Sequence, residues 1–249
     1  MPPGRTLSLS LPPFTRAVKW LVIINAGVYL LIELLKVAEP DLGYALFAIL
    51  ALIPQLVTHG WIWQLVTYSF VHAGLFHLLF NMLALWMFGA ELERIWGTRY
   101  FLKFYFVTGV GAGLLTVLFS LLPFEVAHRI QGSVVIGASG AIYGLLLAYA
   151  LYFPDRPIYM YMLFPIPAKV FVAIMGAIAF VSSLSESGGT ANATHLGGLI
   201  VGFLFLKGAR IHPISEVKYR YLKWKINRVR KKFDVYSGGR ANDYDRRVH

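Results

Sequence analysis

Long uncharged stretches dominate the chain, and their lengths predict helices that cross a membrane. A spanning helix takes about 20 mostly apolar residues, because the hydrocarbon layer is about 30 Å thick and a helix rises about 1.5 Å per residue. Six stretches approach this length: residues 20–37, 75–92, 104–122, 134–153, 169–184 and 194–206. The pattern therefore predicts an all-α membrane protein, a bundle of six transmembrane helices.

A seventh apolar stretch, residues 44–57, lies in the long connection between the first two predicted spans. It is too short to cross a bilayer and contains Pro54, which disfavours a continuous helix. We expect this connection to be a long loop that is partly embedded in the membrane interface.

Composition supports a membrane protein and shows where the charge lies. Hydrophobic residues make up 57% of the 249 positions and charged residues 14%, whereas a soluble domain carries roughly 25% charged residues. The net charge is +11, and the segment after Gly208 holds 12 Lys and Arg against four acids. We therefore divide the chain into an N-terminal segment (1–19), a membrane domain (20–207) and a basic tail (208–249). The lack of cysteine excludes disulfides, thiolate nucleophiles and Cys-ligated metals.

Basic residues also predict the orientation, since Lys and Arg collect on the cytoplasmic side of membrane proteins. With six crossings both termini share one side, and that side carries Arg5, Arg16, Lys19, Arg94, Arg99, Lys103, Arg156 and the tail. The opposite connections carry Glu39, Asp41, Glu125, Glu186 and a single strong base, Arg129. We expect cytoplasmic termini, no cleavable signal peptide, and a bacterial plasma (inner) membrane as the location.

Polar side chains inside predicted spans are candidates for function, because lipid penalises an unpaired polar group by several kcal/mol. The candidates are His72, His77, Asn81, Ser139 and His195. His77 and Asn81 are four residues apart and share one helix face. Ser139 opens the fourth stretch, at a depth expected to be about 9 Å below the outer membrane surface. A helix that begins there directs unpaired N–H groups and its positive dipole end at this place, as an oxyanion hole requires.

Small residues predict that the fourth and sixth spans touch, because glycines at four-residue spacing let helix backbones approach closely. The candidate packing glycines are Gly137, Gly140, Gly144, Gly198 and Gly202. Close contact would bring Ser139 within hydrogen-bond range of His195, and an imidazole beside a serine activates it as a nucleophile. We expect a dyad without a carboxylate, with Tyr143 packed against the imidazole or orienting it.

These residues together resemble the rhomboid family of intramembrane serine proteases. The resemblance covers about residues 20–207 and rests on four motifs: His72-Ala-Gly-Leu-Phe-His77-Leu-Leu-Phe-Asn81, Gly137-Ala-Ser139-Gly140 with Tyr143, His195-Leu-Gly-Gly198-Leu-Ile-Val-Gly202, and Glu93-Arg-Ile-Trp-Gly97. It implies that Ser139 is the nucleophile and His195 the general base. It further implies that His77, Asn81 and the Ser139 backbone N–H stabilise the oxyanion, and that His72 organises the cavity and its water.

The resemblance also implies a substrate class, and the sequence departs from the family pattern at one position. Substrates would be transmembrane proteins that enter laterally and are cut near the outer face. The family often carries Trp-Arg about nine residues before the first His of span two, and here that position reads Trp63-Gln64. Any loop-anchoring role that needs a guanidinium is therefore in doubt.

Other interpretations remain open. A rhomboid-like protein without activity could bind membrane clients, although such proteins typically lack the serine or the histidine. A small transporter would fit six spans with a polar interior, but no inverted repeat is evident. We expect no metal or cofactor, because two histidines five residues apart on a helix point about 140° apart and no carboxylate joins them. The tail favours anionic lipids, or only a topogenic charge cluster, over nucleic acid.

Overall fold

The computed structural model describes residues 13–160, 164–184 and 189–210. The chain divides into two units, Met1–Leu206 and Lys207–His249. Residues 211–249, and with them nearly the whole predicted basic tail, lie outside the described residues.

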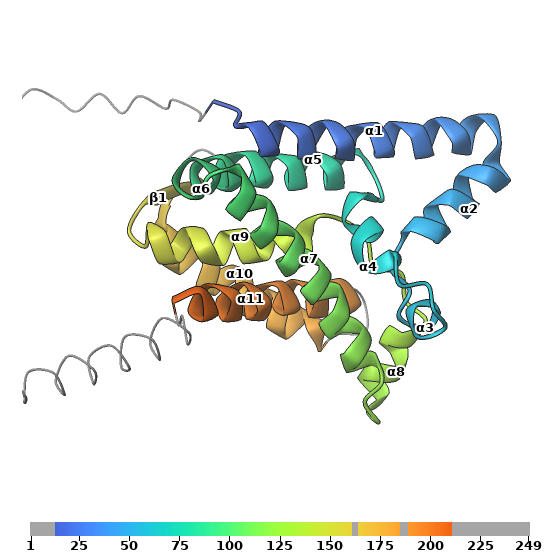
Figure 1. Ribbon diagram of the computed structural model, residues 1–249. Coiled ribbons are helices and arrows are strands. Elements are labelled where there is room, and N and C mark those ends of the chain that lie inside the picture. The colour runs from blue at the N-terminus through green and yellow to red at the C-terminus, as the bar shows by residue number, and fades with distance from the viewer. Residues whose placement is uncertain (1–12, 161–163, 185–188, 211–249) are drawn as a thin grey trace, which may run out of the picture. The chain divides into compact units, whose positions relative to one another are not determined.

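Helices account for most of the described residues (Figure 1). Their bounds are α1 Arg16–Ala38, α2 Pro40–Leu50, α3 Pro54–Thr58, α4 Gln64–Thr67, η1 Tyr68–Phe70, α5 Leu75–Ala84, η2 Leu85–Gly89, α6 Ala90–Trp96, α7 Thr98–Ser120, α8 Glu125–Gln131, α9 Ser139–Tyr152, α10 Ala168–Ser183 and α11 Gly189–Arg210. Strands β1 (Pro157–Met160) and β2 (Phe164–Pro167) pair antiparallel between α9 and α10, with Pro157 opposite Pro167.

The predicted fold class, an all-α membrane protein, is confirmed. Three of the described helices are long and apolar enough to cross a membrane: α1, the continuous helix Leu75–Trp96 formed by α5, η2 and α6, and α7. α9 and α10 are shorter and apolar. The predicted spans correspond to these helices and to α11, so the structure is consistent with six crossings.

Three helices begin five or more residues away from the predicted span starts. α7 begins at Thr98 rather than Phe104, directly after Gly97, whose φ of +75° stops the preceding helix. α11 begins at Gly189, five residues before the predicted start. α9 begins only at Ser139, because Val135 pairs with Leu52 in an extended entry and residues 137–138 then form a bend and a turn.

The connection between α1 and α5, predicted as a long loop, folds into three short helices and one helical turn. Pro40 and Pro54 stand in the first turns of α2 and α3, where the missing N–H costs no hydrogen bond. α2 folds back against α1, and a Cβ at Gly43 would collide with the Lys36 backbone.

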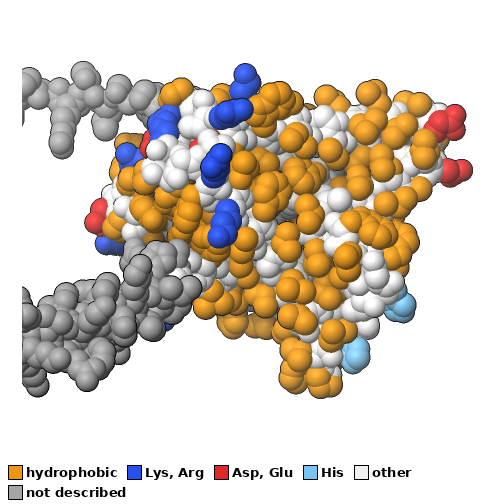
Figure 2. Space-filling view, in the orientation of Figure 1, with side chains coloured by type: hydrophobic (Ala, Val, Ile, Leu, Met, Phe, Trp, Pro, Cys, Tyr) orange, Lys and Arg blue, Asp and Glu red, His pale blue; other side chains and the backbone are white. Residues whose placement is uncertain are grey.

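α9 is the central helix and is buried along most of its length. It packs against α7, α10 and the helix Leu75–Trp96 (Figure 1). The outer helices instead expose apolar side chains such as Val37 of α1 and Phe180 of α10, as expected of surfaces that face lipid. In Figure 2 hydrophobic side chains cover most of the visible face, while Lys and Arg gather toward the end at which α1 begins.

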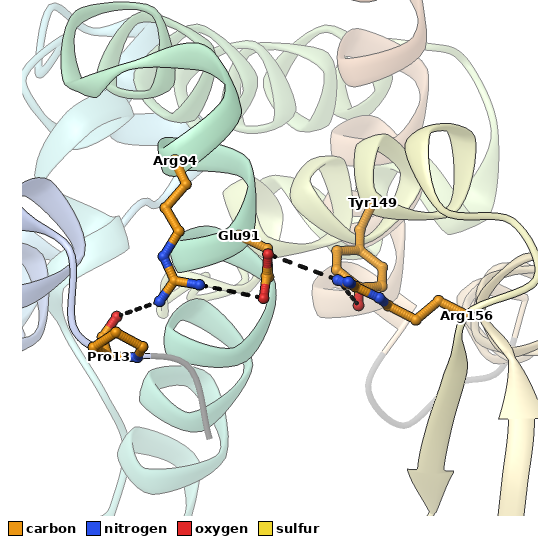
Figure 3. Close-up of polar contacts among 5 residues, drawn as sticks. All are labelled: Pro13, Glu91, Arg94, Tyr149 and Arg156. Carbon is orange, nitrogen blue, oxygen red and sulfur yellow. Dashed lines mark hydrogen bonds and ion pairs between the residues drawn. The ribbon is translucent and has the colours of Figure 1, made fainter. Parts of the chain in front are cut away.

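That same end carries a network of polar contacts around Glu91 of α6 (Figure 3). Arg94 donates to Glu91 and to the carbonyl oxygen of Pro13, at 3.4 and 3.1 Å. Arg156 lies 3.7 Å from Glu91 and donates to the Tyr149 hydroxyl at 3.4 Å. These contacts join the segment before α1, helix α6 and the end of α9.

Candidate active site

Ser139 is the first residue of α9, and a glycine turn precedes it. Gly137 has φ +104°, a conformation that side chains with a Cβ rarely adopt. Its N–H donates to the carbonyl oxygen of Tyr68 at 2.9 Å, and the buried Tyr68 hydroxyl donates to Gly109 of α7 at 2.7 Å. Tyr68 thus fixes the entry to α9 against α7.

His195 of α11 lies directly beside Ser139. The distance from His195 Nε2 to Ser139 Oγ is 2.8 Å, a hydrogen bond between residues 56 positions apart. The Tyr143 ring, one turn after Ser139, stacks on the imidazole with centroids 4.2 Å apart and planes within 6°. The structure therefore brings these three residues together.

The glycines of α9 and α11 allow this approach. A Cβ at Gly198 would collide with the carbonyl oxygen of Gly140, and a Cβ at Gly202 would lie 3.0 Å from Gly144 Cα. The two backbones are in direct contact at both places, as the spacing of these four glycines predicts.

Gly137 differs from these four, because it lies before α9 and makes room for a side chain rather than for a helix. A Cβ there would lie 2.7 Å from His77 Nε2 and 3.8 Å from Ser139 Oγ. His77 Nδ1 accepts a long hydrogen bond, 3.4 Å, from the Ala73 N–H. In a neutral ring this bond places the proton on Nε2, so that a donor points at the space beside Ser139.

Asn81 lies one turn after His77 and is buried. Its Nδ2 donates to the carbonyl oxygen of His77 at 2.8 Å. An amide nitrogen carries two hydrogens, so this bond leaves one for another acceptor.

Several buried polar atoms of this region have no hydrogen-bond partner among the described residues. They are both ring nitrogens of His72 and Nδ1 of His195. The His72 ring lies edge-on to His77 with centroids 5.0 Å apart. Buried polar atoms are nearly always satisfied, so this cluster has the capacity to bind water or a polar ligand. No group of three or more metal-ligating side chains occurs within the described part of the chain.

Gln64 stands at the position where the family often has an arginine. Its side-chain amide anchors the connection between α2 and α3. The side chain is fully buried. Oε1 accepts from the Ile53 N–H at 3.0 Å, and Nε2 donates to the carbonyl oxygen of Ala48 at 3.2 Å.

Sequence reasoning missed a second polar pair beside His195. Thr194 Oγ1 lies 2.8 Å from Thr116 Oγ1 of α7, and both side chains are buried. The available signal was Thr194, a polar residue inside an apolar span and next to a candidate base. Nothing in the sequence indicates that its partner is Thr116, 78 positions away.

Comparison with known proteins finds a family match over the part of the chain that holds these site residues. The family model described as "Rhomboid domain" matches residues 59–209, a range that contains Ser139, His195, Tyr143, His77, Asn81 and His72. The chain belongs to the rhomboid family.

Curated rhomboid relatives match over half or more of the chain. Rhomboid protein 1, mitochondrial, of Saccharomyces cerevisiae is 32% identical over 139 residues, which is 55% of this chain and 39% of that protein. Rhomboid protease GluP of Bacillus subtilis is 36% identical over 154 residues, 60% of this chain and 26% of that protein. RHOMBOID-like protein 2 of Arabidopsis thaliana is 27% identical over 174 residues, 70% of this chain and 50% of that protein. The matched region therefore spans half or less of each relative.

Proposed function

We propose that this rhomboid is an intramembrane serine endopeptidase that cleaves transmembrane or membrane-adjacent segments of other membrane proteins. The observation that carries the proposal is the 2.8 Å distance from Ser139 Oγ to His195 Nε2, between two helices in backbone contact. The family includes proteases, as the name of the Bacillus subtilis relative states.

In the proposed reaction Ser139 Oγ attacks the carbonyl carbon of the scissile peptide bond while His195 Nε2 takes the hydroxyl proton. The imidazolium then gives that proton to the leaving amine, and the peptide C–N bond breaks to leave an acyl-serine ester. Water attacks the ester with His195 again as base, which frees the second product and restores the serine. For Nε2 to accept, the neutral ring carries its proton on Nδ1.

The negative oxygen of the tetrahedral intermediate would be stabilised at the start of α9. The first N–H groups of a helix have no intrahelical acceptor, and the helix dipole is positive there. The Ser139 N–H, His77 Nε2 and the second Asn81 hydrogen are the donors we assign to the oxyanion. The space that a Cβ at Gly137 would fill adjoins two of these residues.

The length of α9 supports a site that lies inside the membrane. Fourteen residues span about 21 Å, against a hydrocarbon layer of about 30 Å. If the end of α9 at Tyr152 lies at one membrane surface, Ser139 lies below the opposite surface. The Lys- and Arg-rich end of the molecule favours cytoplasmic termini. We therefore propose a plasma-membrane protein whose site opens toward the outer face and whose substrates enter from the bilayer.

The test is labelling of the purified full-length protein with a fluorophosphonate, which reacts with activated serines, followed by cleavage of a model transmembrane substrate in liposomes. We expect labelling and cleavage by the wild type, and neither by Ser139→Ala. Ser133→Ala is the matched control, because Ser133 lies in the connection just before α9 and its hydroxyl donates to the Ile130 carbonyl oxygen. Labelling that persists in Ser139→Ala contradicts the assignment, and an unlabelled, folded wild type favours a client-binding protein.

A further inference from the structure

A pair of threonine hydroxyls joins α7 to α11 next to His195. Thr116 Oγ1 and Thr194 Oγ1 are 2.8 Å apart, and each residue is 1% exposed. We propose that this pair positions His195, holding its Nε2 on Ser139 Oγ. The proposal rests on the proposed function, since it assigns a role in the reaction of that dyad.

Thr194 contacts both neighbouring helices at the level of the dyad. Its hydroxyl faces Thr116 of α7, while a Cβ at Gly140 of α9 would lie 3.3 Å from Thr194 Cγ2. Gly140 directly follows Ser139, and Thr194 directly precedes His195. A rotation or shift of α11 that moves the imidazole must therefore also move the Thr194 side chain against α7 and α9.

Counting the hydrogens of the two hydroxyls shows that one hydrogen bond joins α7 to α11. Thr116 Oγ1 lies 2.9 Å from the carbonyl oxygen of Ala112, and Thr194 Oγ1 lies 3.1 Å from that of Thr190. Each hydroxyl has a single hydrogen, so one threonine donates to its own helix and the other donates across the pair. Such interhelical bonds contribute little to stability in membranes. Their directionality makes them suited to fixing a geometry.

Tyr143 of α9 stacks on the His195 ring, and the threonine pair adds a directional contact of this part of α11 to α7. The glycines that face α9 set how near the backbones come, but they have no side chain to interlock. On another side α11 borders an apolar cavity of about 640 Å³, lined by Leu196, Gly197 and Ile200 of α11 together with Leu115, Thr116 and Phe119 of α7 and residues of α8 and α10. Thr116 of the pair is among the residues that line this cavity.

The test measures the kcat and KM of transmembrane-substrate cleavage, and the rate of fluorophosphonate labelling, for four variants. Thr194→Val and Thr116→Val each keep the shape and remove one hydroxyl. We expect each to lower kcat and labelling about tenfold with KM within about twofold, because small displacements of reacting groups slow chemistry more than binding. Thr194→Ser keeps the hydroxyl and should stay within about twofold of the wild type.

Thr108→Val is the matched control. Thr108 is a buried threonine two turns earlier on α7, and its Oγ1 has no hydrogen-bond partner among the described residues. This variant should cleave like the wild type.

The outcomes separate the two proposals. An unlabelled wild type refutes the proposed function and this inference with it. A labelled wild type with unchanged kcat in folded Thr194→Val, or in folded Thr116→Val if the first variant does not fold, refutes the inference alone. Equal losses in Thr194→Ser and Thr194→Val, or in Thr108→Val, also overturn it, because the effect would then not come from the hydroxyl pair.

Discussion

The two ends of α9 differ in how the ionisable side chains buried there are paired. At the Ser139 end, His72 and His195 keep ring nitrogens without partners among the described residues. At the other end, the Glu93 carboxylate accepts from the hydroxyls of Thr15 and Thr98 and from two backbone N–H groups at the start of α1.

The difference indicates a division of tasks. A carboxylate that satisfies the first N–H groups of a helix stabilises the fold, since those groups have no intrahelical acceptor. Unpaired donors and acceptors cost stability but remain available to a substrate and to water. Changes at the Ser139 end should therefore reduce activity more than stability, and changes at the Glu93 end the reverse.

The largest effect should come from Gly137→Ala. A Cβ would meet His77 Nε2 at 2.7 Å, and the φ of +104° strains any residue with a side chain. We expect at least about a hundredfold loss of fluorophosphonate labelling, because the displaced imidazole no longer faces the space beside Ser139. Thermal unfolding in detergent should show that the protein still folds.

Gly132→Ala is the control for this variant. Gly132 belongs to the same connection, has φ −95°, and a Cβ there meets no described atom within 4 Å. Its labelling rate should equal that of the wild type. Full labelling of Gly137→Ala would instead show that His77 is not needed where the structure places it.

Glu93→Ala should produce the largest loss of stability. Glu93 is 4% exposed, and its removal leaves the N–H groups of Ala17 and Val18 and two hydroxyls without their acceptor. We expect the free energy of unfolding to fall by about 2–4 kcal/mol, as hydrogen bonds to a charged group contribute about 1.5–3 kcal/mol. Denaturant titration of the purified protein measures this quantity.

Glu93→Gln keeps the shape and one acceptor oxygen, so it should cost less than Glu93→Ala. In both variants the molecules that remain folded should be labelled at the wild-type rate. A labelling rate that falls in proportion to stability would show that the two ends of α9 are not independent.

Much of the fold could be predicted from the sequence, because lipid imposes a length on spanning helices and penalises buried charge. The apolar stretches located the main helices, and glycine spacing predicted the contact between α9 and α11. The ends of the helices were less predictable, because local features such as the positive φ of Gly97 determine where a helix stops.

Apart from the contact between Ser139 and His195, which the glycine spacing and the motifs indicated, contacts that depend on a particular side chain in a distant segment could not be predicted. Glu93 is separated from Ala17 by 76 positions and Thr116 from Thr194 by 78. Gln64 was noticed only as a departure from a motif, and its amide bonds to Ile53 and Ala48 depend on where α2 and α3 fold. Periodicity records which face of a helix is buried, but not which hydroxyl or amide lies opposite.

The smallest effect should come from Arg156→Gln, at the same end of α9 as Glu93 but at the surface. The Arg156 side chain is 44% exposed and lies 3.7 Å from Glu91. The hydrogen bond to Tyr149 and the charge of Glu91 raise the pKa of Arg156 above its ordinary value. We expect a stability loss of no more than about 1 kcal/mol, since exposed ion pairs contribute little.

Lys169→Gln is the matched comparison, because it removes an ion pair with Asp155 in which both side chains are more than half exposed. Its effect on unfolding should be no larger than that of Arg156→Gln. Arg156 and Lys169 flank the β-hairpin that leads into α10, so both variants also test whether this end acts on the site. If Arg156→Gln slowed labelling of Ser139 while Lys169→Gln did not, the contacts around Glu91 would have to transmit an effect along α9, and the separation of the two ends would be wrong.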